Sequence, residues 1–219
     1  MAQVTMYGFW RSLAAYRVRV ALNLKSISYD EPMIDLLKGE QFSAHYKAVN
    51  PQSVVPALDL HDGKKALFQS LAILEYLDES HPNPPLMPKG ARDRARVRGL
   101  ALIAAADTHP LVVPRIRNYL EHDLKLDEPA RMVWLRRWID QGSQAIETHL
   151  ASDGETGKFS HGDTLTIADI CLASHWVGAK TFGADTTSFP VFGRVIGVCM
   201  TMDAFAKAHP TKQPGAPAS

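Results

Sequence analysis

The stretch that decides the fold is VTMYGFWRSLAAYRVRVALNLK, residues 4–25. Its first part, VTMYGF (4–9), is short and rich in β-branched and aromatic residues, which is typical of a β-strand. Apolar residues then recur at helical spacing. They are Leu13, Tyr16, Val20 and Leu24, with Arg17, Asn23 and Lys25 off this stripe. The sequence therefore predicts a strand followed directly by a helix, with Arg11 and Ser12 at the junction.

The next segments extend this unit to about residue 80. SYDEPMIDL (28–36) reads as a second strand, and Pro32 indicates a position near a sheet edge. Strand, helix and strand form a βαβ unit, which normally has parallel strands. PALDLHDGKKALF (56–68) places a strong turn signal, Asp62-Gly63, between two apolar runs, so it predicts a hairpin. Ser70 then precedes the helical run LAILEYLDES (71–80).

The segment SHPNPPLMPKG (80–90) contains four prolines and is the best candidate for a linker. After it the pattern is helical over 92–110, 128–150 and 162–180, and Thr166 and Asp169 form a capping box at the start of the last segment. We therefore expect an α/β domain with the order βαβ-ββα over residues 1–82, a linker over 83–90 and an all-α domain over 91–219.

Composition limits the possible partners. Of the 219 residues, 46% are hydrophobic, enough for a sizeable core. The net charge of +1 provides no overall electrostatic attraction to nucleic acid. We find no apolar run long enough for a membrane span. MAQVTMYGFWRS lacks the apolar region of a signal peptide. With only two cysteines, Cys171 and Cys199, we expect no disulfide framework and a cytoplasmic protein.

The spacing of the residues excludes several motifs that would indicate a specific chemistry. Cys171 and His175 could share a helix face, but two ligands do not make a zinc site, so we expect no metal. The cysteines are too far apart for a CxxC dithiol, and no GxSxG elbow, P-loop or GxGxxG is present in the sequence.

Three short features allow both a structural and a functional interpretation. Ser12 is either a helix N-cap or a hydrogen-bond donor to a bound thiolate, whose pKa the helix start, Arg11 and Arg17 would lower. Gln69-Ser70 is either a cap or a clamp for a carboxylate at a second helix start. Val55-Pro56 is either a rigid turn or, with a cis bond, a backbone edge that pairs with an extended peptide.

In this order and spacing the three features resemble the zeta class of glutathione transferases, which includes glutathione-dependent isomerases of maleylacetoacetate and maleylpyruvate. The resemblance covers nearly the whole chain. The matching segments are FWRSLAAYRVRVALNLK (9–25), NPQSVVPALDL (50–60), QSLAILEYLDE (69–79), DTHPLVVPRIRNYL (107–120) and GDTLTIADICL (162–172).

The resemblance implies a thioredoxin-like domain followed by a helical domain, a homodimer, and glutathione as cofactor. It implies that Ser12 activates the glutathione sulfur and that Arg11 meets a substrate carboxylate. It also implies two groups of binding positions. Glutathione would be bound, or its cleft lined, by Gln41, Val55, Pro56, Gln69, Ser70 and His109. The substrate would be bound by Arg115, with Lys180 as a substitute for an arginine that the family has and this chain lacks.

Two departures from the family pattern bear on the activity. The family commonly reads SSC after the arginine, whereas this chain reads Ser12-Leu13-Ala14, so chemistry that needs a protein thiol is disfavoured. The family usually has an arginine directly before the phenylalanine that corresponds to Phe182, whereas this chain has Thr181 at that position. We therefore expect a maleylacetoacetate or maleylpyruvate isomerase. The alternatives are a general transferase acting on small electrophiles such as α-halo acids, and a non-catalytic binding module on the same fold.

Overall fold

The computed structural model describes residues 3–217. The chain divides into two compact units. The sheet unit contains residues up to 85 together with the segment from 202 onward, and the helical unit contains residues 86–201. Each unit is described below by itself.

The sheet unit is built on a four-stranded sheet with the order β2-β1-β3-β4. The strands are β1 (Val4–Tyr7), β2 (Tyr29–Asp30), β3 (Ala57–Asp59) and β4 (Leu67–Phe68). β1 and β2 are parallel, and the β1–β3 and β3–β4 pairs are antiparallel. The predicted βαβ unit and the predicted hairpin are both confirmed.

The second strand is much shorter than its sequence pattern predicted. Only Tyr29 and Asp30 pair as a strand, where a strand within 28–36 was expected. The chain leaves the ladder before Pro32, which has no N–H to donate, and a single bridge between Gly8 and Met33 continues the alignment. β2 lies at the edge of the sheet, as Pro32 indicated.

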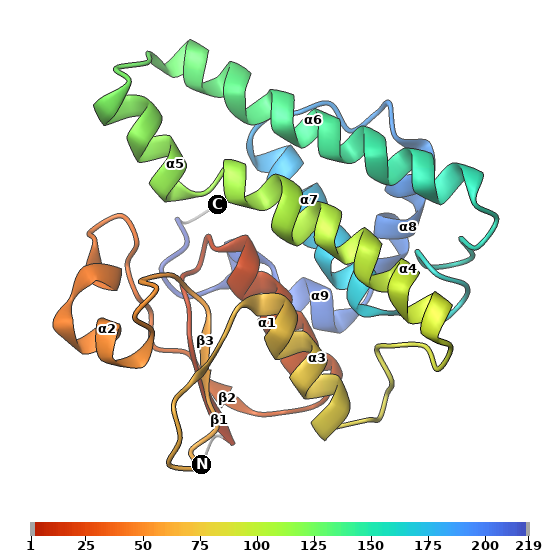
Figure 1. The fold of residues 1–219 in the computed structure, drawn as a ribbon, viewed down its shortest axis with the longest axis horizontal. Helices are drawn as coiled ribbons and strands as arrows, with labels where there is room; N and C mark the ends of the chain where they lie inside the picture. The colour runs from red at the N-terminus through yellow and green to blue at the C-terminus, as the bar shows by residue number, and fades with distance from the viewer. Residues whose placement is uncertain (1–2, 218–219) are drawn as a thin grey trace. The chain divides into compact units, whose positions relative to one another are not determined.

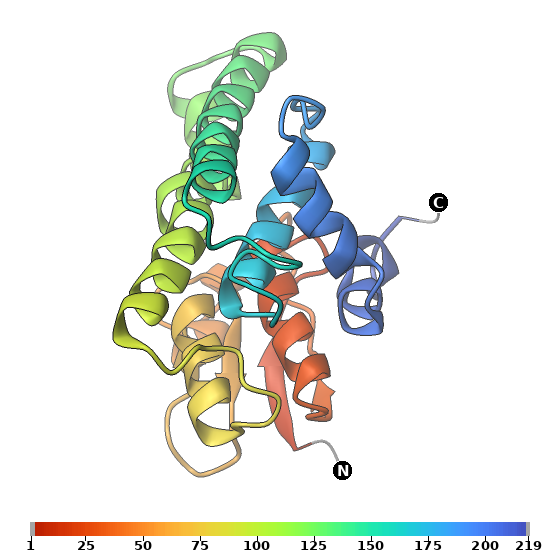
Figure 2. The same cartoon turned by 90° about the vertical axis from the view of Figure 1, so that its right-hand side faces the viewer.

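Helices α1 (Leu13–Leu24) and α3 (Ser70–Ser80) pack against each other beside the sheet (Figure 1). α9 (Asp203–Ala208) packs against α1, so the C-terminal segment belongs to this unit (Figure 2). α1 is buried around its whole circumference from Ala15 to Leu22. Arg17 and Lys25, which lie off the apolar stripe, are nevertheless buried, at 2% and 8% exposure, because α3 and α9 both pack against α1.

The remaining elements of the sheet unit are shorter. They are the 3-10 turns η1 (Glu40–Phe42) and η5 (Pro210–Lys212) and the helix α2 (Ala44–Val49). η1 and α2 connect β2 to β3, and α2 is capped by Ser43, whose hydroxyl accepts a hydrogen bond from the Tyr46 N–H at 3.2 Å. The chain between the second and third strands is thus an ordered, capped connection.

The helical unit has α7 at its centre, in contact with α4, α6 and α8 (Figures 1 and 2). Its elements are α4 (Ala91–Leu102), η2 (Ile103–Thr108), η3 (His109–Leu111), α5 (Pro114–Asn118), η4 (Tyr119–Asp123), α6 (Glu128–Ser152), α7 (Ile167–Thr181) and α8 (Pro190–Met200). η2 and η4 are π-helical, and such segments interrupt the regular helix where the chain bends.

The capping box at the start of α7 is present as the sequence predicted. The Asp169 carboxylate accepts a hydrogen bond from the Thr166 N–H at 2.8 Å, and it also accepts one from the Ser160 N–H at 2.7 Å. Asp169 is fully buried, and this burial raises the pKa of its carboxyl group against the opposing effect of these hydrogen bonds. The box therefore fixes the start of the most buried helix of the unit.

A search for helices long and apolar enough to cross a membrane finds none among residues 3–217.

Candidate functional site

Ser12 is the N-cap of α1. Its hydroxyl oxygen accepts a hydrogen bond from the Ala15 N–H at 3.1 Å, and its own N–H donates to the Phe9 carbonyl at 2.9 Å. The structural interpretation of Ser12 is thus confirmed. It does not compete with the functional one, because a hydroxyl that accepts through its oxygen keeps its hydrogen for a second partner. Ser12 and the preceding Arg11 are both partly exposed.

Gln69 and Ser70 form the start of α3. Gln69 has a positive φ of 67°, which is uncommon for a residue other than glycine. Its side-chain amide donates a hydrogen bond to Gln52 Oε1 at 2.8 Å. Ser70 is buried, and its Oγ accepts a hydrogen bond from Arg17 Nη1 at 2.9 Å. The exposed Gln69 thus directly precedes the first turn of α3, whose backbone N–H groups have no partner within the helix.

Val55 and Pro56 are joined by a cis peptide bond immediately before β3, as one interpretation of the sequence anticipated. The preceding carbonyl, that of Val54, accepts hydrogen bonds from Tyr46 Oη at 2.7 Å and from Asn50 Nδ2 at 2.8 Å. The buried side chains of Tyr46 and Asn50 therefore hold the backbone just before the cis peptide bond.

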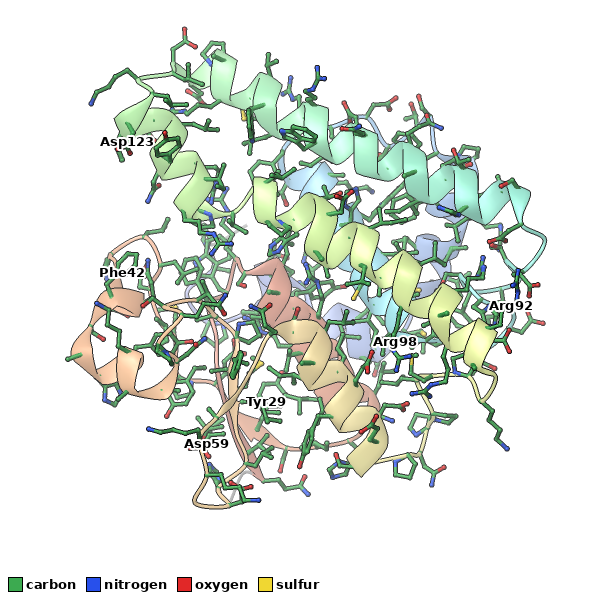
Figure 3. All side chains as sticks on the ribbon, viewed as in Figure 1. Tyr29, Phe42, Asp59, Arg92, Arg98 and Asp123 are labelled. Atoms are coloured by element: carbon green, nitrogen blue, oxygen red, sulfur yellow. The ribbon has the colours of Figure 1, made fainter. Side chains whose placement is uncertain are left out.

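Gln41 lies in η1, and its neighbour Phe42 is labelled in Figure 3. Gln41 is 8% exposed, and its Oε1 has no hydrogen-bond partner among the described residues. A buried amide oxygen without a partner is costly, so this atom fits the acceptor of a ligand N–H.

The register of the sheet explains how these positions come together. Tyr7 pairs with Ala57, and Ala57 pairs with Phe68, so the three residues form one row across β1, β3 and β4. The chain leaves β1 towards Ser12 just after this row, enters β3 from Val55-Pro56 just before it, and enters α3 at Gln69-Ser70 just after it. All three predicted features therefore lie where the chain leaves or enters neighbouring strands, at the same end of β1, β3 and β4.

The other predicted residues lie in the helical unit. His109 begins η3 and is half-buried, and Arg115 is exposed on α5. Lys180, in the last turn of α7, places its ammonium nitrogen 5.9 Å from the centre of the Trp176 ring. Thr181 is exposed, and its hydroxyl donates to the Val177 carbonyl at 2.8 Å. The roles of these residues and of those in the sheet unit stay predictions.

The sequence pattern did not reveal the partners of these residues. Arg19 is fully buried and donates to the Phe9 carbonyl, Gln52 supports Gln69, and Tyr46 holds Val54. An arginine within an otherwise apolar helical run is the one signal that could have indicated a buried cation with a specific partner.

Comparisons with known proteins show the family to which the chain belongs. The family described as "Glutathione S-transferase, N-terminal domain" matches residues 2–79. A maleylpyruvate isomerase from a Ralstonia species is 43% identical over 95% of this chain and 98% of its own length. A probable maleylacetoacetate isomerase from Vibrio cholerae is 39% identical over 99% of this chain and all of its own.

Solved structures extend the similarity to the whole fold. The maleylacetoacetate isomerase of Methylobacterium extorquens AM1, determined with bound malonate and glutathione (GSH), is 48% identical with a TM-score of 0.95, and the match covers 98% of this chain and 100% of the other. A holo maleylpyruvate isomerase, described as a bacterial glutathione S-transferase of the zeta class, is 42% identical with a TM-score of 0.93 and coverage of 97% and 100%. The chain has the thioredoxin-like and helical parts of this fold and belongs to the zeta-class glutathione transferases, the family of the maleylacetoacetate and maleylpyruvate isomerases.

Proposed function

We propose that this protein is a glutathione-dependent enzyme that isomerises the cis double bond of maleylpyruvate or maleylacetoacetate to trans. The observation that carries the proposal is the register of the sheet, which brings the segments that carry Ser12, Val55 and Gln69 to the same end of β1, β3 and β4. The names of the similar relatives support it, as do the glutathione-bound structures among them.

The residues at this end of the strands offer the polar groups that glutathione needs for binding. Gln41 offers a buried acceptor without a partner, and the Val55 backbone lies at the turn into β3. Gln69 and Ser70 present the N-terminal amides of α3, where a carboxylate is favoured by the helix dipole. When bound, glutathione supplies the thiolate that adds reversibly to a conjugated double bond and so permits rotation about it.

Ser12 would hold the sulfur in its ionised form. Its hydroxyl hydrogen is available to donate, because its oxygen already accepts from Ala15. The positive end of α1 and the Arg11 guanidinium add to the effect, since both favour a nearby anion. Ser12 thus keeps the nucleophile reactive at neutral pH.

Arg11 and Arg115 are the arginines proposed to orient the two carboxylates of the substrate. A guanidinium binds a carboxylate through two parallel hydrogen bonds and stabilises negative charge that develops next to it. We also propose that His109 lines the cleft and that Lys180 gives a weaker, single-point contact.

Isomerisation suits this chain better than the two alternatives. Leu13 and Ala14 occupy the positions where the family commonly has serine and cysteine, so no protein thiol is offered there. The general transferase remains the second candidate, but the similar relatives named above are isomerases. A binding module without activity would need Ser12 as a helix cap, but it would have no need for a site that keeps a thiol ionised.

We further propose a homodimer, a cytoplasmic location and a functional division at the segment 83–90, with glutathione bound by residues of 1–82 and the substrate site lined by residues of 91–219, although the compact sheet unit also includes the segment from 202 onward. The dimer is supported by the family, and the location by two buried cysteines that are free thiols. Light scattering on dilute protein tests the dimer, and a monomer at all concentrations would contradict it.

The function is tested by steady-state kinetics with maleylpyruvate and with maleylacetoacetate, each with and without glutathione. We expect the trans isomer to form only when glutathione is present, and with different kcat/KM for the two substrates. Conversion of neither substrate, combined with glutathione consumption against an α-halo acid, would support the general transferase instead.

A further inference from the structure

Arg19 lies beneath the loop that carries Arg11 and Ser12. It is fully buried within α1, and its Nη2 donates a hydrogen bond to the Phe9 carbonyl at 2.9 Å. Its Nη1 makes a longer contact, 3.5 Å, with the Trp10 carbonyl. Arg19 therefore binds the backbone of the two residues that precede Arg11.

The Phe9 carbonyl accepts a second hydrogen bond, from the Ser12 N–H at 2.9 Å. One oxygen thus receives both the guanidinium of Arg19 and the amide of Ser12. A displacement of this oxygen would move the Ser12 backbone, and with it the hydroxyl and the N-terminal turn of α1.

Glu31 fixes the guanidinium from the other side. Its carboxylate accepts hydrogen bonds from Arg19 Nε at 2.8 Å and from Nη2 at 2.6 Å, so the contact is bidentate. Glu31 follows β2, whose Tyr29 is labelled in Figure 3. Such a pair sets the plane of the guanidinium as well as its position, which a lysine could not do.

Gly8 gives independent support for this arrangement. A Cβ atom at position 8 would collide with the Glu31 carboxylate, and Gly8 is not among the described residues with positive φ. The glycine is therefore explained by space for Glu31 at the end of β1 and not by a turn. Gly8, Glu31 and Arg19 form what we call the loop clamp.

We propose that the loop clamp positions the Ser12 hydroxyl, with Arg19 as a positioning residue that acts through the Phe9 and Trp10 carbonyls. The inference rests on the proposed role of Ser12 towards the glutathione sulfur. Arg19 is buried and touches the backbone, so its influence on the sulfur passes through the loop and not through a direct contact.

The test uses Glu31→Gln and Gly8→Ala, with Asp78→Asn as the matched control. Asp78 accepts a hydrogen bond from Lys25 Nζ at 2.9 Å, and Lys25 also donates to the His81 and Pro84 carbonyls. This is a second buried ion pair on α1 that binds backbone, but it lies at the opposite end of the helix from Ser12. Asp78→Asn thus reports the purely structural cost of losing such a pair.

The readout is the ultraviolet absorbance of the thiolate in the glutathione complex, titrated against pH, together with the pH profile of kcat/KM. We expect Glu31→Gln and Gly8→Ala to move the thiol titration to higher pH. Turnover near neutral pH should fall about 10-fold, because small displacements of a positioned donor are costly. The deficit should shrink at alkaline pH, where the thiol ionises without help. Asp78→Asn should lower thermal stability and leave the thiol titration unchanged.

Ser12→Ala separates this inference from the function on which it rests. If Ser12→Ala shifts the thiol titration and both clamp variants do not, the loop clamp has no positioning role. If Ser12→Ala itself leaves the titration unchanged, the proposed role of Ser12 is wrong. If Asp78→Asn shifts the titration as much as Glu31→Gln does, the effect is general destabilisation and the inference is overturned.

Discussion

Arg17 on α1 donates a hydrogen bond from Nη1 to the Oγ of Ser70, the first residue of α3, at 2.9 Å. Because the serine oxygen accepts from a cation, its hydroxyl hydrogen points elsewhere, and in the proposed glutathione complex it would donate to the ligand carboxylate at the start of α3. Arg17 also brings positive charge to the same place while remaining 2% exposed.

Replacing Arg17 should therefore weaken glutathione binding. We expect Arg17→Met, which keeps an unbranched buried side chain, to reduce affinity about 10-fold, or roughly 1.4 kcal/mol. Titration calorimetry measures the change. The double variant with Ser70→Ala should lose little more than either single variant, because both remove the same hydrogen bond. Fully additive losses would show that Arg17 does not act through Ser70.

Ser12→Ala should lower turnover more than glutathione affinity. Loss of a hydrogen bond to an anion costs roughly 1.5–3 kcal/mol, so turnover at neutral pH should fall about 10- to 150-fold. Ser43→Ala is the matched control, because Ser43 caps α2 as Ser12 caps α1. Each variant should lose about 1 kcal/mol of stability from its cap, but only Ser12→Ala should lose activity. Equal losses of activity in both would show that Ser12 acts as a cap alone.

The alkaline stability of the sheet unit should depend on Tyr46. Burial raises the pKa of its phenol from 10.0 to about 12. A folded-state pKa above the unfolded value means that the stabilising contribution is complete below pH 10 and is lost as the pH rises through about 12. Denaturant unfolding at a series of pH values should show this loss in the wild type and a shallower loss in Tyr46→Phe. An identical slope in both proteins would contradict the assignment.

Local sequence signals were sufficient for the order of the strands, for α1, α3, α4, α6 and α7, and for the three short features around Ser12, Val55 and Gln69, whereas α2, α8 and α9 were not predicted. Asp62-Gly63 marked the hairpin and Thr166 with Asp169 marked the start of α7, because turns and caps depend on a few neighbouring residues. The placement of the segments that carry Ser12, Val55 and Gln69 at the same end of three strands depends on pairing between distant strands. Sequence motifs named these residues, but only the register shows that their segments share this end of the sheet.

The supporting contacts could not be read from the sequence. Arg17 and Lys25 lie off the apolar stripe of their helix, and one helix considered alone gives no sign that α3 and α9 both cover it and bury these two cations. The pairing of Arg19 with Glu31, and the space that Gly8 leaves for it, join three segments of the chain. Such contacts become visible only when the segments are placed in three dimensions.

Position 181 offers a test of substrate recognition. Thr181 is exposed, and its hydroxyl donates a hydrogen bond to the Val177 carbonyl of the same helix. Because threonine is uncharged, this position offers no cation to a carboxylate. We expect Thr181→Arg to lower KM for the dicarboxylate about 3- to 10-fold with little change in kcat, because it adds binding shared by ground and transition states. Thr181→Gln is the uncharged control. An unchanged KM in both variants would show that this position does not contact the substrate.

The central claim is that glutathione takes part in the reaction without being consumed. The direct measurement follows maleylpyruvate or maleylacetoacetate by chromatography in the presence of substoichiometric glutathione, while total free thiol is determined at the same time points. We expect complete conversion to the trans isomer over many turnovers per glutathione, with the amount of free glutathione unchanged at the end. Conversion that stops after one equivalent of glutathione, with a stable thioether as the product, would contradict it.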